Sequence, residues 1–162
     1  MKWLKRLFAA SATHNVVVSA PKPTTPSGRP NRQGIPATVR IVQFGTCDFD
    51  VVGESSYQDA LAAIAGPAPD DGHEAPVTVW LICQDQNPHD RNAVAVVVQE
   101  KIVGYLSRAD AREYRKSLRE ETGSLPSAMT AGLIVGGGIK RKTGERMHLG
   151  IRIDLAIPVE IE

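Results

Sequence analysis

The feature that most constrains the fold is a segment in which apolar and polar residues alternate. Between residues 147 and 157, every second side chain is apolar, and these residues are Leu149, Ile151, Ile153, Leu155 and Ile157. The residues between them are Gly150, Arg152, Asp154 and Ala156. This period of two is typical of a β-strand with one buried and one solvated face. We therefore predict a half-buried strand, with Asp154 on the solvated face.

Other short segments also carry strand signals. A turn near Glu100 and Lys101 predicts a β-hairpin, and residues 67–76 have the composition of a loop. The further predicted strands cover residues 38–44, 48–52, 77–83, 93–98, 102–106 and 129–135.

Helix signals occur twice. Ser55 and Gln58 have the spacing of a capping box, which predicts a short helix ending near Gly66. Ser107 is the predicted cap of a second helix. That helix has Ala111, Tyr114 and Leu118 on one face and ends before Gly123 and Pro126.

Two helices are too few to cover both faces of a parallel sheet. The chain of 162 residues, 42% of them hydrophobic, has the size and composition of one folded domain. We therefore predict a mainly β (α+β) fold: a small, largely antiparallel β-barrel with two helices at its ends.

A basic arm precedes the predicted domain, which we expect to span residues 37–162. Residues 1–36 contain six basic residues and no acidic one. Met1–Ala10 has an amphipathic pattern, which suits either contact with a membrane surface or partner, or a frayed terminus. Pro-rich residues 20–36 predict a disordered linker.

The chain lacks an apolar run near the roughly 20 residues that span a bilayer, so we expect no integral membrane association. Met1–Ala10 also lacks the uninterrupted apolar stretch of a secretion signal. Cys47 and Cys83 are the only cysteines, and we expect reduced thiols. These features predict a cytoplasmic protein, with association with the nucleoid as an option.

Charge is unevenly distributed along the predicted domain. Residues 37–90 contain nine acidic residues and one basic residue, Arg40, whereas residues 91–146 contain 11 basic and six acidic residues. A nucleic acid would have to contact the second segment and the arm, because phosphates need nearby Lys or Arg. Solvated helix faces also carry charge runs, so this pattern leaves both interpretations open.

Motifs for catalysis are missing. Gly136–Gly138 precede a basic stretch without the spacing of a phosphate loop, which indicates a basic hairpin turn. Neither cysteine has a partner at zinc-ligand spacing, and no nucleophile motif occurs. We expect a binding module without a cofactor, and a metal-dependent nuclease is the third alternative.

Three sequence motifs, in a fixed order along the chain, resemble those of a known family. They are VGESSYQDAL at residues 52–61, NPHDRNAVAV at 87–96 and VGYLSR at 103–108. Together they resemble the HIRAN domain, over about residues 37–158. The resemblance implies an OB-like barrel that binds single-stranded DNA, captures a free 3′ end in one member, and acts in DNA repair or replication with a possible protein partner from those processes.

Asn87 and Asp90 match the loop of that family, where Asp accepts a hydrogen bond from a terminal 3′ hydroxyl. Arg108 matches a basic position, while His89 and Ser56 stand where the DNA-binding member has aromatic residues. With the basic hairpin included, the candidate nucleic-acid-binding residues are Ser55, Ser56, Tyr57, Asn87, His89, Asp90, Arg91, Arg108, Lys140, Arg141 and Lys142.

Three of the candidates also have a structural interpretation. Asn87 and Asp90 are common loop residues that cap their own backbone. Tyr57 could anchor its helix in the core, and we expect Tyr105 in the core. A barrel that binds a protein or peptide instead of DNA is the main alternative function.

Overall fold

A computed structural model describes residues 38–162. The basic arm and its predicted boundary at Ala37 lie outside the described residues. No helix among the described residues is long and apolar enough to cross a membrane. The elements in chain order are β1 (Val39–Arg40), β2 (Phe49–Asp50), the 3-10 helix η1 (Glu54–Ser56), α1 (Gln58–Ala65), β3 (His73–Cys83), β4 (Val94–Val98), β5 (Lys101–Tyr105), α2 (Arg108–Thr122), β6 (Ala128–Gly136) and β7 (Leu149–Ile153).

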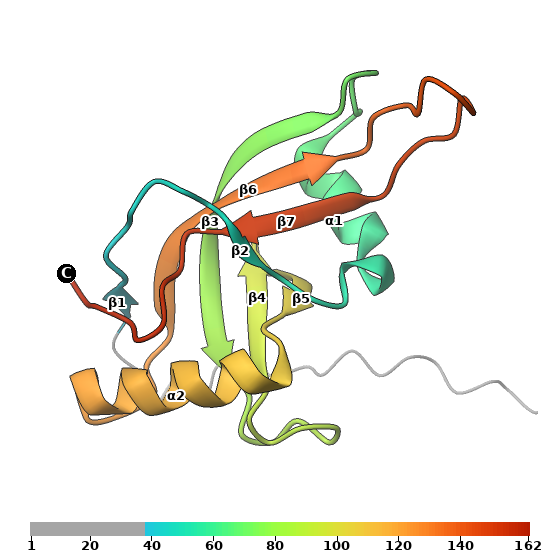
Figure 1. Cartoon of the computed structure of the whole chain (residues 1–162). Helices are drawn as coiled ribbons and strands as arrows, with labels where there is room; N and C mark the ends of the chain where they lie inside the picture. The colour runs from blue at the N-terminus through green and yellow to red at the C-terminus, as the bar shows by residue number, and fades with distance from the viewer. Residues whose placement is uncertain (1–37) are drawn as a thin grey trace, which may run out of the picture. The chain divides into compact units, whose positions relative to one another are not determined.

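One curled sheet dominates the fold (Figure 1). Its strands follow the order β2-β7-β6-β3-β4-β5 through antiparallel pairs, and β1 pairs in parallel with β6. An isolated antiparallel bridge between Val52 and Tyr105 links the segment after β2 to β5 at the other edge. The predicted mainly β (α+β) class with an OB-like, barrel-like sheet and two helices is confirmed.

The long strand β3 sets the two ends of the sheet. It pairs with β6 from His73 opposite Gly136 to Leu81 opposite Ala128. The loop of residues 84–92 therefore begins at one end of β3, and the β6–β7 turn lies beside the other end. Figure 1 shows α2 crossing the end where β3 terminates.

The strand predicted near residues 147–157 is shorter than expected. Leu149, Ile151 and Ile153 are buried as the alternation predicts, but β7 stops at Ile153. Asp154 is only 1% exposed, so its predicted place on the solvated face is wrong. Its carboxylate accepts hydrogen bonds from the backbone N–H groups of Phe44 (3.2 Å) and Gly45 (2.6 Å). These donors offset the cost of burying the carboxylate.

The loop predicted over residues 67–76 is also shorter than expected, because β3 already begins at His73. Pro76 is thus within a strand, where its missing N–H would normally break pairing. In the register, β4 pairs only with Trp80–Cys83. The first part of β3 therefore has an open edge, where proline is tolerated.

The capping box predicted at Ser55 and Gln58 does not form. Tyr57 is the N-cap of α1 and makes no side-chain cap hydrogen bond. Gln58 instead donates from Nε2 to the carbonyl of Leu149 (2.8 Å) and accepts from the Leu149 N–H (2.9 Å). A long-range contact has replaced the local one, and it ties α1 to β7.

The second predicted helix is confirmed as α2. Ser107 is its N-cap, and its Oγ accepts from the Asp110 N–H at 3.2 Å. Gly123 ends it with a left-handed φ of 72°. Ala111, Tyr114 and Leu118 are buried on the face packed against the sheet.

Candidate nucleic-acid interface

Gly104 allows the chain after β2 to lie against β5. A Cβ at this position would collide with the side chain of Val51 and lie 3.0 Å from the Val52 carbonyl oxygen. Because Gly104 has no side chain, the two segments come close enough for Val52 and Tyr105 to exchange two backbone hydrogen bonds of 2.8 and 2.9 Å. This bridge places Tyr105 close to η1 and the start of α1.

Two tyrosine rings meet at this point. The ring centroids of Tyr57 and Tyr105 are 6.2 Å apart and the rings are tilted by 49°. Both side chains are half-buried, so the predicted core position of Tyr105 is wrong in part. Burial, reinforced by the Tyr57 hydroxyl and opposed by the Gln84 side chain, raises the pKa of Tyr105 to about 12. Tyr105 therefore presents a neutral ring at neutral pH.

A polar loop of residues 84–92 begins at Gln84, whose side chain opposes the rise in the Tyr105 pKa. Asn87 donates from Nδ2 to the Gln84 side-chain oxygen (2.8 Å). Its own side-chain oxygen accepts from the N–H groups of His89 (2.9 Å) and Asp90 (3.3 Å). The local capping interpretation of Asn87 thus holds, and these bonds fix the conformation of the loop.

Asp90 and Arg108 face each other across the end of this loop. The Asp90 Oδ1 accepts from the Asn92 N–H at 2.8 Å. The Asp90 Oδ2 is 3.9 Å from Arg108 Nε, which is too long for a hydrogen bond. The Arg108 side chain is 77% exposed. Each residue therefore keeps hydrogen-bonding capacity for a ligand.

Basic side chains continue along α2 from Arg108. Arg112 and Arg119 are exposed, while Arg115 is buried and pairs with Asp85 of the polar loop. Burial raises the pKa of the Cys83 thiol beside this pair, and the Arg115 cation opposes that shift. Cys47 and Cys83 are both free. The Arg115–Asp85 pair anchors the polar loop to α2.

The predicted candidates divide into two groups. Tyr57, Asn87, Asp90 and Arg108 form a connected set with Tyr105 and Gln84, and the exposed candidates beside it are Ser55, Ser56, His89 and Arg91. Lys140, Arg141 and Lys142 lie on the β6–β7 turn, at the opposite end of β3. At roughly 3.3 Å per residue, this 11-residue strand separates the two groups by up to about 33 Å.

Tyr105 and Gln84 were not among the predicted site residues. The signal for Tyr105 was its position after Gly104, since a glycine inside a strand marks close approach of another chain segment. Gln84 carries no such signal, because its role depends on the fold that brings it to Tyr105.

The described residues contain no group of three or more His, Cys, Asp or Glu side chains placed to hold a metal ion. Comparison with family models, curated proteins and solved structures finds no match for this chain. The HIRAN resemblance therefore stays a prediction.

Proposed function

We propose that this chain is a non-catalytic module that binds single-stranded DNA and holds its 3′ end, in DNA repair or replication. The observation that carries the proposal is the connected set formed by the Tyr57–Tyr105 pair, the polar loop and Arg108. Strand-binding barrels combine aromatic rings, on which bases stack, with cations that follow the phosphates.

The tyrosines are suited to the terminal bases. Stacking on aromatic side chains is worth roughly 1 to 3 kcal/mol per base and tolerates any base. Ser56 provides no aromatic surface where the DNA-binding HIRAN member has it, and Tyr105 compensates because its ring lies against Tyr57. Binding of strands therefore does not depend on an aromatic residue at position 56.

Asp90 is suited to the terminal hydroxyl. Its Oδ1 is occupied by the Asn92 N–H, whereas Oδ2 accepts no hydrogen bond from the described residues and has Arg108 Nε at 3.9 Å. A 3′ hydroxyl can donate to Oδ2, while Arg108 contacts the phosphate that precedes it. A 3′ phosphate would bring negative charge against the carboxylate and remove the donor.

The proposal is tested by fluorescence anisotropy with single-stranded and double-stranded oligonucleotides of one sequence, over a series of salt concentrations. We expect tighter binding of the single strand, weakening with salt as phosphate contacts require. Equal binding of both forms, or binding of neither, would contradict the proposal. Binding of neither would favour the alternative of a protein- or peptide-binding barrel.

A further inference from the structure

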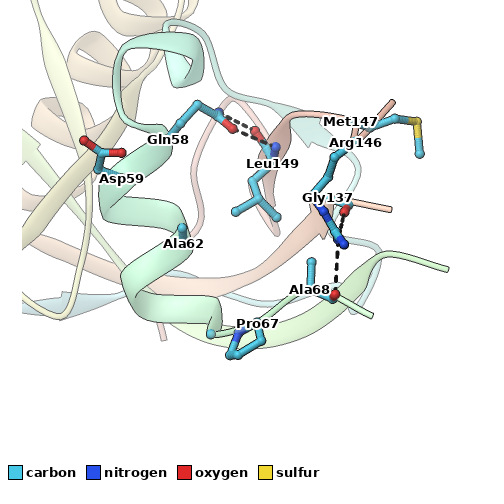
Figure 2. Close-up of a pocket in the computed structure, with 10 residues that line it drawn as sticks. Gln58, Asp59, Ala62, Pro67, Ala68, Gly137, Arg146, Met147 and Leu149 are labelled. Atoms are coloured by element: carbon cyan, nitrogen blue, oxygen red, sulfur yellow. Dashed lines mark hydrogen bonds between the residues drawn. The ribbon is translucent and has the colours of Figure 1, made fainter. Parts of the chain in front are cut away.

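A groove of about 500 Å³ lies between α1 and the base of the β6–β7 turn. Figure 2 shows α1 on one side, with Gln58, Asp59 and Ala62, and Arg146 and Met147 on the other. The paired hydrogen bonds between Gln58 and Leu149 form part of its wall. The groove was not part of the predicted site.

The groove lies between the start of α1, next to Tyr57, and the base of the basic turn. Its first lining residue, Gln58, directly follows Tyr57, and its far end is lined by Gly137 and Arg146 of the turn. α1 has eight residues and is therefore about 12 Å long at roughly 1.5 Å per residue. With bases stacked at roughly 3.4 Å, this length corresponds to about four nucleotides.

Arg146 is the basic residue that lines the groove, and Arg141 and Lys142 lie further out on the same turn. Arg146 donates from Nη1 to the carbonyls of Gly137 (2.8 Å) and Ala68 (3.2 Å), which fixes its guanidinium at the rim (Figure 2). Arg141 and Lys142 are exposed, and within residues 38–162 neither forms a salt bridge. Lys140 pairs with Glu145 at 3.0 Å.

Apolar surface lies beside this charge. Met147 is 41% exposed, and Pro67 and Ala68 also line the groove. Asp59 is an acidic lining residue, on the first turn of α1 close to Tyr57. Basic residues at one end of the groove and apolar residues along its lining suit an anionic chain whose bases have flat, apolar faces.

We propose that this groove binds the nucleotides that precede the 3′ end, with Arg141, Lys142 and Arg146 holding their phosphates and Met147 contacting a base. The inference deepens the proposed function and depends on it. A DNA strand fits better than a peptide, because regularly spaced negative charges match the basic turn. Arg141 and Lys142 lie too far from Asp90 to contact the 3′ end, and the groove gives them a role in binding the preceding phosphates.

The test compares 3′-ended oligonucleotides of about two and about eight nucleotides by anisotropy at several salt concentrations. The double variant Arg141→Gln/Lys142→Gln removes two charges without removing a hydrogen bond within the described residues. We expect it to lower the salt slope for the long oligonucleotide by about 1.4, at about 0.7 per phosphate contact, and to leave the short one unchanged. Met147→Ala should weaken binding of the long oligonucleotide and leave binding of the short one unchanged.

The matched control is Lys101→Gln/Lys116→Gln, which removes two exposed charges outside the groove and the tyrosine site. An equal loss of salt slope for the long oligonucleotide in the test and control variants would overturn the inference. Unchanged binding of the long oligonucleotide by Arg141→Gln/Lys142→Gln would overturn it as well. If the wild type binds both oligonucleotide lengths with equal affinity, the inference about the groove is overturned but the proposed function is not. Absence of all strand binding would overturn both.

Discussion

The rings of Tyr57 and Tyr105 lie 6.2 Å apart, although they come from opposite sides of a closure between the two edges of the sheet. Their contact depends on the bridge between Val52 and Tyr105, which in turn depends on Gly104. The feature that closes the curled sheet therefore also assembles the aromatic surface of the candidate site.

Replacing Tyr105 with Leu should weaken binding of single-stranded DNA by about 1 to 3 kcal/mol, because a stacking ring is lost. Tyr105→Phe keeps the ring and serves as the control, with near wild-type binding. Anisotropy titrations measure both. Equal losses for the Leu and Phe variants would assign the effect to the hydroxyl and contradict stacking.

Replacing Gly104 with Ala should lower the free energy of unfolding by about 1 to 3 kcal/mol, since the added methyl group overpacks against Val51. Urea denaturation measures the change. Combining it with Val51→Ala makes room for the methyl group, so the two losses should not add. Strict additivity would show that the close approach of these segments does not limit stability.

The strand and helix types follow well from local patterns, whereas the contacts that build the site do not. Ser107 and Gly123 mark the ends of α2 because capping is local. The failures at Gln58 and Asp154 share one cause: each side chain bonds to backbone far away in sequence, at Leu149 and Phe44. No local pattern encodes such partners.

The candidate site was predicted in the same uneven way. Asn87, Asp90 and Arg108 were predicted from short sequence motifs that also determine the local structure of their loop and helix. The fold brings these residues together. The contribution of Tyr105 depends on edge closure, a tertiary event. A strand pattern places it beside buried Val103 and Leu106 and cannot reveal its partly exposed ring.

Stability should fall at high pH because of Tyr105. The fold raises the pKa of this residue from its ordinary 10 to about 12, so the neutral side chain is favoured in the folded state. Its contribution is complete below pH 10 and is lost as the pH rises toward 12. Urea denaturation between pH 9 and 12 should show a steeper fall for the wild type than for Tyr105→Phe. Parallel pH profiles would contradict this assignment.

Replacing Arg108 with Ala should weaken binding of all single strands alike and reduce the salt slope by about 0.7, the value of one phosphate contact. The control is Lys116→Ala, a residue of α2 outside the site. Anisotropy over a salt series gives both slopes. A loss confined to free 3′ ends would instead place Arg108 in recognition of the terminal hydroxyl.

Asp90 carries the claim of end recognition, which is tested most directly by wild-type affinity for one oligonucleotide with either a 3′ hydroxyl or a 3′ phosphate. We predict that the hydroxyl end binds more tightly, by about 1 to 3 kcal/mol, because it can donate to Asp90. Asp90→Asn retains an oxygen for the Asn92 N–H and should narrow the difference. Equal wild-type binding of the two ends would contradict 3′-end capture.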